Sequence, residues 1–267
     1  MANRIIPPQG NLQTKNSTDS QSYCELCGDS GWMVTIKDGY EIASPCKCYK
    51  ERIRNNKIRF ANIPEAYKDI RLDSFNRGYY SDKEAINEVI ATVKYYLNNL
   101  QEMIDEGIGL YFYSDMKGSG KTRMATSIAN ELIYEHNMNV RFVTGLDIIS
   151  EIRATWDRDS EMKSEGQLMR YLTSVDVLVI DDFGIEKRTE EMNWIDDKFY
   201  QIINSRYTAK QITIYTSNYS IGQLKYNQRI SNRIMERIYQ VHFPEESVRE
   251  GIAAARQRKL KQAIKEG

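Results

Sequence analysis

The chain has 267 residues, of which 37 are Lys or Arg and 37 are Asp or Glu, so its formal net charge at pH 7 is zero. This length allows one large or two modest domains with a sizeable core. The balanced charge excludes a chain drawn as a whole to nucleic acid or to an anionic membrane. No segment approaches the run of about 20 apolar residues that a membrane span needs, and the N-terminus lacks the apolar stretch of a signal peptide. We therefore expect a cytoplasmic protein with no membrane partner.

The N-terminal region combines a polar leader with four clustered cysteines. Residues 1–22 are rich in Asn, Gln, Ser, Thr and Pro, a composition typical of a disordered leader. The pairs Cys24-x-x-Cys27 and Cys46-x-Cys48 follow. In a reducing compartment, two close pairs favour a zinc site over disulfides. Four thiolates make a closed tetrahedral site with a structural role. The alternative is that these cysteines are simply buried.

The segment between the cysteine pairs predicts a β-hairpin. Residues 32–43 alternate apolar and polar side chains around Asp38-Gly39, a tight-turn signal. Two ligand pairs joined by a hairpin are typical of a zinc-ribbon-like knuckle. We assign residues 23–50 to such a module, whose folding depends on the metal.

A basic helix and a linker are expected next. Residues 46–59 carry six basic side chains against one acidic one. Such a run is typical either of a solvated helix face or of a surface that holds a phosphate backbone. We place a helix at 50–60, which Asn62-Ile-Pro ends, and assign residues 51–81 to this helix and the following linker.

From residue 82 onward the pattern is that of an α/β domain. Apolar residues three and four apart predict one long helix over 82–106, ended by Gly107 and Gly109. Beyond it, apolar strands alternate with helices, which predicts a parallel sheet with helices on both faces, a three-layer α/β/α core. Strands are expected at 110–113, 139–144, 176–181 and 211–216, and helices at 121–136, 145–156, 164–173, 193–207, 227–240 and 247–265.

The strand at 110–113 runs into a glycine-rich turn. Its residues are Lys117, Gly118, Ser119, Gly120, Lys121 and Thr122. Such a turn offers backbone N–H groups to a phosphate, and the helix that follows adds its dipole. Lys121 is expected to reach the β- and γ-phosphates, and the Thr122 hydroxyl to bind Mg²⁺. Asp115 departs from the G-x-x-x-x-G-K-[ST] pattern, which has glycine there; an ordinary turn before a helix is the alternative.

Two carboxylates end the strand at 176–181. Ligands of parallel sheets bind at the carboxyl ends of the strands. We therefore predict that Asp181 holds Mg²⁺ together with Thr122 and that Asp182 is the general base for an attacking water. The alternative is that the two aspartates only end the strand and begin a turn.

Polar residues further along are candidates to complete the site. The strand at 211–216 leads to Asn218, whose carboxamide could hydrogen-bond the water or the γ-phosphate. Arg229, Arg233 and Arg237 have the spacing of one helix face. That face is either a solvated basic surface or the source of an arginine that reaches the nucleotide of a neighbouring subunit.

With these motifs in place, the chain resembles the DnaC/DnaI-type replicative helicase loaders of bacteria and their phages, within the AAA+ ATPases. The resemblance covers nearly all of the chain after residue 22. It rests on Cys24-Glu-Leu-Cys-Gly-Asp-Ser-Gly, Pro45-Cys-Lys-Cys, Gly118-Ser-Gly-Lys-Thr, Asp181-Asp-Phe-Gly, Thr216-Ser-Asn218, Arg229-Ile-Ser-Asn-Arg233 and Ser247-Val-Arg249. It implies an AAA+ ATPase domain over residues 82–267, preceded by the zinc module.

The resemblance also implies roles for single residues. Asn218 would be the sensor-1 residue, Arg233 a finger that acts on a neighbour's nucleotide, and Arg249 a sensor-2-like contact within the same chain. Arg153 and Trp156 would contact single-stranded DNA by charge and stacking, although Trp156 could equally pack in the core.

The implied function is that of a phage or prophage loader. It would use ATP and Mg²⁺ to place a hexameric replicative helicase on single-stranded DNA, assemble into a homo-oligomer on binding nucleotide or helicase, and grip the helicase with its zinc module. Two alternatives stay open. One is a transposition-type AAA+ ATPase that acts on a transposase; the other is an adaptor that binds nucleotide without hydrolysing it.

Overall fold

A computed structural model describes residues 23–37, 39–156, 164–185 and 193–266. The chain divides into two compact units, Met1–Lys57 and Ile58–Gly267, which are described separately. The predicted leader at 1–22 lies outside the described residues.

The N-terminal unit contains a hairpin. Strands β1 (Trp32–Lys37) and β2 (Tyr40–Pro45) pair antiparallel along their whole length. Gly39 lies in the turn between them with a φ of 84°, a conformation that residues with a Cβ rarely adopt. The predicted hairpin is confirmed, while Asp38 lies outside the described residues. Helix α1 (Tyr49–Ala61) begins in this unit and confirms the helix expected at 50–60.

Short helical segments precede the sheet of the second unit. They are η1 (Glu65–Tyr67), η2 (Leu72–Ser74), η3 (Arg77–Tyr79), α2 (Lys83–Asn98) and α3 (Leu100–Glu106). The prediction of one helix over 82–106 is therefore wrong. Asn99 breaks it, with φ −111° and ψ 29°, and its side-chain amide also donates to the carbonyl of Tyr95 (2.8 Å), a local bond typical of asparagine outside helix interiors. Gly107 ends α3 with a φ of 66°, as expected.

A five-stranded parallel sheet forms the centre of the second unit, with the strand order β4-β5-β6-β3-β7. The strands are β3 (Gly109–Tyr113), β4 (Val140–Thr144), β5 (Val177–Asp181), β6 (Ile212–Ser217) and β7 (Ile238–His242). The helices around it are α4 (Lys121–Tyr134), α5 (Gly145–Ala154), α6 (Glu165–Ser174), α7 (Asn193–Thr208), α8 (Gln228–Glu236) and α9 (Val248–Glu266).

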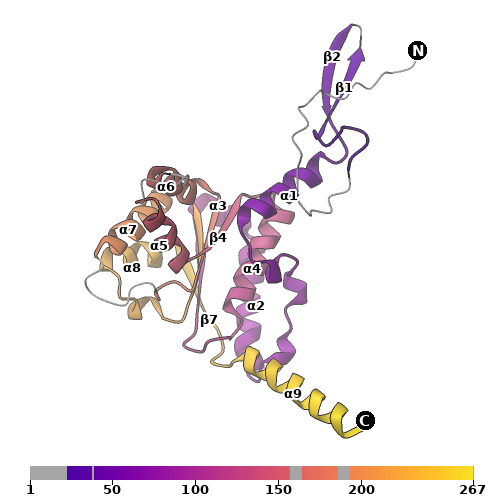
Figure 1. The fold of residues 1–267 in the computed structure, drawn as a ribbon. Helices are drawn as coiled ribbons and strands as arrows, with labels where there is room; N and C mark the ends of the chain where they lie inside the picture. The colour runs from indigo at the N-terminus through magenta and orange to yellow at the C-terminus, as the bar shows by residue number, and fades with distance from the viewer. Residues whose placement is uncertain (1–22, 38, 157–163, 186–192, 267) are drawn as a thin grey trace. The chain divides into compact units, whose positions relative to one another are not determined.

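Two apolar clusters cover the two faces of this sheet. Successive residues of β3 alternate between them: Leu110 and Phe112 belong to one cluster, and Tyr111 to the other. Helices α2, α3 and α4 supply the first cluster and α5 to α8 the second, so the helices lie in separate layers (Figure 1). The predicted three-layer α/β/α core is confirmed.

Strand β7 is missing from the prediction, which extended a helix over 227–240. Helix α8 ends at Glu236, and Ile238 to His242 pair in parallel with β3 at the edge of the sheet. The helical spacing of isoleucine and arginine residues continues up to the strand and hides the boundary. Pairing with β3 decides the outcome, because it satisfies the backbone of a segment rich in β-formers. The strand brings the residues after His242 beside the turn that follows β3.

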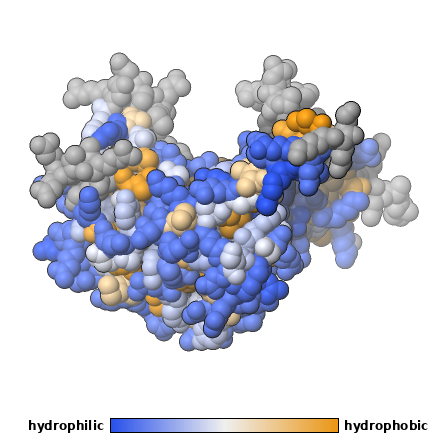
Figure 2. All heavy atoms as spheres, turned by 90° about the horizontal axis from the view of Figure 1, so that it is seen from below, coloured by the Kyte–Doolittle hydropathy of each residue, from blue (hydrophilic) through white to orange (hydrophobic). Residues whose placement is uncertain are grey.

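Helix α9 is the last element of the chain. Its side chains from residue 251 to residue 264 are exposed to solvent. Within the described part of the chain, no helix is both long and apolar enough to cross a membrane. The face of the molecule in Figure 2 is mainly hydrophilic, with apolar side chains scattered over it in small groups.

Candidate nucleotide-binding site

The glycine-rich turn has the backbone that its sequence predicts. Gly118 and Gly120 have φ values of 80° and 103°. A Cβ at Gly120 would stand 2.4 Å from the hydroxyl oxygen of Tyr80, and one at Gly118 would stand 3.1 Å from the Cβ of Arg249. Both positions therefore favour glycine by conformation, and Gly120 also by space. Lys121 begins α4 immediately after the turn.

The Lys121 side chain is folded back into the turn. Only 6% of the residue is exposed. Its Nζ donates to the carbonyls of Ser114 (3.1 Å) and Met116 (2.9 Å) and to the hydroxyl of Ser119 (3.2 Å). Burial lowers the pKa of Lys121, and the nearby carboxylates, Asp182 first, oppose this shift. The ammonium group thus already lies at the phosphate-binding turn.

Thr122 and Asp181 meet although 59 positions separate them. The Thr122 hydroxyl donates to Asp181 Oδ1 (2.8 Å), and the Thr216 hydroxyl donates to the same oxygen (2.5 Å). Burial raises the pKa of Asp181, and these hydrogen bonds only partly offset it. A hydroxyl beside a carboxylate is a hard oxygen donor set, which suits Mg²⁺. The two residues predicted to hold the ion therefore fit it.

Asp182 and Asn218 follow neighbouring strands, β5 and β6. Asp182 has a φ of 52°, and its backbone N–H donates to the Thr216 hydroxyl (3.0 Å). The left-handed backbone conformation of Asp182 turns the chain at the end of β5. The side chains of Asp182 and Asn218 line the same cleft as the glycine-rich turn.

The cleft has a volume of about 700 Å³, within the range of small-molecule sites. Of the residues predicted for the nucleotide site, those lining it are Lys117, Gly118, Ser119, Gly120, Lys121, Thr122, Asp182, Asn218 and Arg249. Asp181 lies at its base through the bond to Thr122. The structure thus brings together most of the predicted site.

Arg233 does not line this cleft. Its Nη2 donates to the Tyr200 hydroxyl (3.1 Å), and its guanidinium lies 5.0 Å from the centre of the Tyr207 ring. The prediction that Arg229, Arg233 and Arg237 share one helix face is wrong for Arg237. That residue follows the end of α8 and donates to the carbonyl of Glu106 (2.5 Å).

Several residues at the site escaped the sequence prediction. Tyr80, from the segment before α2, donates its hydroxyl to the carbonyl of Ser119 (2.7 Å). Tyr67, from the same segment, lines the cleft. Glu245, from the joint between β7 and α9, accepts hydrogen bonds from Asp115 and Met116, just before the glycine-rich turn. Each approaches from a distant part of the chain and carries no local motif.

The predicted DNA contacts lie on α5 and just beyond it. Trp156 is 54% exposed, so the alternative that it packs in the core is excluded. Its ring centre lies 5.0 Å from that of Trp194, and its Nε1 donates to Glu165 (3.2 Å). The guanidinium of Arg153 lies 5.3 Å from the Trp194 ring centre. Trp194 therefore joins the two predicted residues.

The four cysteines of the first unit converge. Their sulfur atoms all lie within 4.8 Å of one another, with Cys24 and Cys46 at 3.7 Å and Cys27 and Cys48 at 3.4 Å. A tetrahedral zinc with Zn–S bonds of about 2.3 Å needs sulfur atoms roughly 3.8 Å apart. The donor set and its spacing fit zinc.

Comparison with known proteins identifies the family. The sequence profile of the family described as "IstB-like ATP binding protein" matches residues 47–250. The chain belongs to this family. Its ATP-binding character agrees with the cleft around Lys121.

Individual proteins are also similar to this chain. The chain is 23% identical to the phage-like element PBSX protein XkdC of Bacillus subtilis, over 82% of this chain and 81% of that protein. It is 27% identical to the replicative helicase loader DnaC of Buchnera aphidicola subsp. Baizongia pistaciae, over 67% of this chain and 66% of that protein. The crystal structure of the DnaC helicase loader matches with a TM-score of 0.57 and 22% identity, over 67% of this chain and 99% of that one.

These findings confirm the resemblance to DnaC/DnaI-type loaders that the motifs predict. The structural match establishes the fold, an α/β core built on a parallel sheet. The matched segment covers about two thirds of the Buchnera protein.

Proposed function

We propose that the chain is an ATP-hydrolysing loader that places a hexameric replicative helicase on single-stranded DNA. The observation that carries the proposal is the convergence of Lys121, Thr122, Asp181 and Asp182 at one cleft of an ATP-binding family member. The similarity to helicase loaders supports the identity of the partner.

In this proposal each residue at the cleft has one task. Lys121 binds the β- and γ-phosphates, and Thr122 and Asp181 hold Mg²⁺, which neutralises phosphate charge when bound. Asp182 accepts a proton from the attacking water. Asn218 orients that water or the γ-phosphate, and Arg249 contacts the nucleotide from the start of α9.

Arg233 would act on the nucleotide of a neighbouring subunit. It does not line its own cleft, and its guanidinium is only half-buried beside Tyr200 and Tyr207. Such an arginine is worth roughly 10³–10⁵ in rate where it has been measured. The chain would therefore hydrolyse ATP as a homo-oligomer formed on binding nucleotide or helicase.

The remaining surfaces would contact the two macromolecules. Arg153 offers a cation, Trp156 an exposed aromatic ring and Trp194 a partly buried one, and these groups suit the bases of single-stranded DNA. The zinc module at 23–50 would grip the helicase, ahead of a basic helix and linker at 51–81 and an ATPase domain at 82–267. Loss of DNA binding in a Trp156→Ala variant, measured by fluorescence anisotropy, tests the first assignment.

Hydrolysis is tested by ATPase assays on the full chain with the helicase and single-stranded DNA. We expect Lys121→Ala to abolish turnover, because the phosphate contact is lost. Arg233→Ala should lose turnover but keep nucleotide affinity, since its task lies in the neighbouring site. The matched control is Arg229→Ala, an exposed arginine one turn earlier on α8. Turnover unchanged by Lys121→Ala would favour the non-hydrolysing adaptor.

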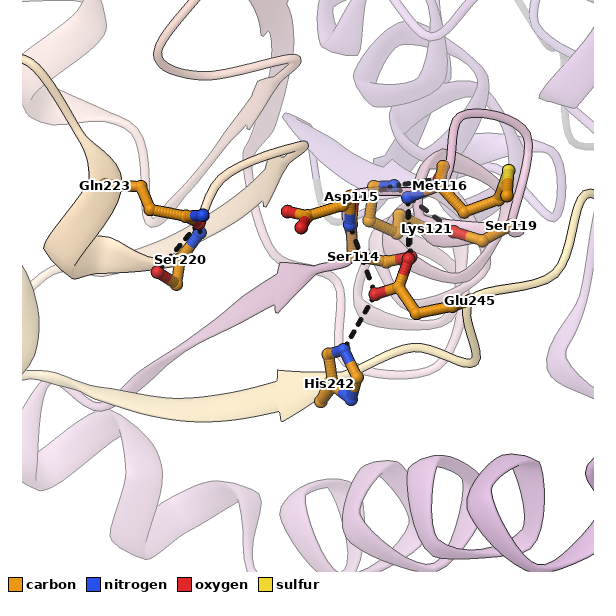
Figure 3. A network of polar contacts seen from close by, with 9 residues as sticks. All are labelled: Ser114, Asp115, Met116, Ser119, Lys121, Ser220, Gln223, His242 and Glu245. Carbon is orange, nitrogen blue, oxygen red and sulfur yellow. Dashed lines mark hydrogen bonds and ion pairs between the residues drawn. The ribbon is translucent and has the colours of Figure 1, made fainter.

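The departure from the motif at Asp115 is the sequence feature that favours a non-hydrolysing adaptor, and the backbone weakens this argument. Asp115 is not among the described non-glycine residues with positive φ, so its position makes no demand for glycine. Its exposed carboxylate points away from Lys121 in Figure 3.

The partner is tested by affinity capture from host lysate. Recovery of a hexameric helicase, lost in a Cys24→Ser, Cys27→Ser variant that still binds nucleotide, is the expected result. Recovery of a transposase instead would replace the loader with the transposition-type alternative.

A further inference from the structure

The joint between β7 and α9 lies against Asp115 and Met116, the two residues that form the entrance of the glycine-rich turn. The Glu245 carboxylate accepts hydrogen bonds from two consecutive backbone N–H groups there, those of Asp115 (3.2 Å) and Met116 (2.8 Å). Figure 3 shows this carboxylate between the turn and the ring of His242, whose Nε2 lies 2.9 Å from Glu245 Oε1. A residue 130 positions away from Asp115 thus holds the entrance of the turn.

The carbonyl groups of the same segment hold Lys121. Its Nζ donates to the carbonyls of Ser114 (3.1 Å) and Met116 (2.9 Å). The N–H groups of the segment therefore meet a carboxylate, while its carbonyls meet an ammonium group. Hydrogen bonds to charged groups are roughly twice as strong as neutral ones. Together the two charges fix the orientation of these peptide units.

This arrangement accounts for the aspartate at the position where the motif has glycine. Glu245 contacts Asp115 and Met116 through their backbone N–H groups, so the side chain at position 115 does not matter to these contacts. The Asp115 side chain is exposed. The entrance of the turn is held from outside by a carboxylate rather than by a conformation that only glycine adopts.

We propose that Glu245 is a positioning residue for Lys121. By binding the N–H groups of Asp115 and Met116, it keeps the turn in the conformation that presents the ammonium group to the β- and γ-phosphates. His242 steadies the carboxylate and is itself in contact with the Tyr113 ring, with centres 4.9 Å apart. The inference rests on the proposed nucleotide site and adds a residue outside its motifs.

The neighbouring glutamate provides a matched control. Glu246 also accepts two backbone N–H bonds, from Ser81 (2.7 Å) and Asp82 (2.7 Å) at the start of α2. It thus ties the same joint to a helix rather than to the turn. A variant at Glu246 disturbs the joint to a similar extent but leaves the bonds to Asp115 and Met116 in place.

The test compares the affinities of full-length variants for ATP, ADP and AMP. Lys121 is expected to contact only the β- and γ-phosphates, so Glu245→Ala should weaken ATP and ADP roughly tenfold, about one good hydrogen bond, and change AMP less than about twofold. Glu245→Gln keeps one acceptor oxygen and the size of the side chain, and should fall between wild type and Glu245→Ala. It also carries the test if thermal unfolding shows that the alanine variant has not folded.

Two results would overturn the inference. One is an equal loss of affinity for ATP and AMP in the Glu245 variants, which is the signature of a merely structural role. The other is a selective loss of ATP in Glu246→Ala. A wild-type protein that binds ATP no more tightly than AMP would instead remove the proposed phosphate site itself.

Discussion

The two units of the chain support their sites by different means. In the described part of the first unit, the buried apolar side chains are those of Cys27 and Cys46, both predicted metal ligands, while hairpin residues such as Tyr40 and Ile36 are exposed. In the second unit, two apolar clusters surround the sheet, and the cleft lies on top of them. We therefore expect the first unit to depend on a bound metal to fold, whereas the second has an apolar core of its own that can support charged groups at its site.

Supporting charged groups in this way has an electrostatic cost. Lys121 and Asp181 are 6% and 7% exposed. Burial lowers the pKa of Lys121 and raises the pKa of Asp181, and both shifts favour the uncharged form of the side chain. Such shifts are typical of functional sites, where the surrounding core must compensate. The difference between the units predicts opposite responses when the chemistry of each site is removed.

Removing zinc should have the largest effect, and only on the first unit. Structural zinc contributes about 10–16 kcal/mol to the folding of small zinc modules. We expect purified protein to carry one zinc per chain, and chelation to expose residues 23–57 to proteases while the second unit keeps its thermal transition. Metal analysis and limited proteolysis check this. Unchanged protease resistance after complete metal removal would contradict the metal-dependent first unit.

Removing a buried arginine should have the next largest effect, on the second unit. Arg206 of α7 is 1% exposed and donates to the carbonyls of Leu172 (3.0 Å), Val175 (3.0 Å) and Ile212 (2.6 Å). Burial lowers its pKa to about 10. Arg206→Met would leave these carbonyls without this donor, which should lower the free energy of unfolding by roughly 3–5 kcal/mol.

The control for Arg206 is Arg170→Met on the neighbouring helix α6. Arg170 is exposed, so its replacement should change stability by less than about 0.5 kcal/mol. Urea unfolding of both variants provides the measurement. Equal stabilities would mean that the interior arginine does not join these segments.

Most of the fold could be predicted because its signals are local. Apolar strands and amphipathic helices alternate in the sequence, and Gly118 and Gly120 mark the turn. Strand β7 could not be predicted, because an exposed edge strand has little apolar pattern of its own and forms only by pairing with β3. The break at Asn99 also escaped the prediction, since the apolar spacing continues across it and a single asparagine marks it.

The same distinction between local signals and contacts made only in the fold applies to the residues of the site. Lys121, Thr122 and Asp181 belong to motifs, and the structure brings them together. Glu245 and Tyr80 belong to none, because they act through contacts between segments that are far apart in the sequence. The arginine spacing wrongly predicted that Arg237 lies on the helix face, because periodicity does not show where a helix ends.

The smallest predicted effect on stability is that of replacing Asp181. This replacement should raise stability, whereas the changes above should lower it. Burial raises its pKa above the ordinary value of about 3.9. The folded state therefore binds its proton more tightly than the unfolded state, and the ionised carboxylate destabilises the fold as pH rises from about 4 through the raised pKa.

Asp181→Asn removes this charge and keeps an oxygen that can accept from Thr122 and Thr216. We expect the nucleotide-free variant to be more stable than wild type at pH 7 by roughly 1 kcal/mol, to lose this advantage near pH 4, and to lose Mg²⁺-dependent turnover. Thermal unfolding across this pH range provides the measurement. A variant less stable than wild type at neutral pH would mean that the carboxylate supports the fold as well as the site, and the contrast between the two units would weaken.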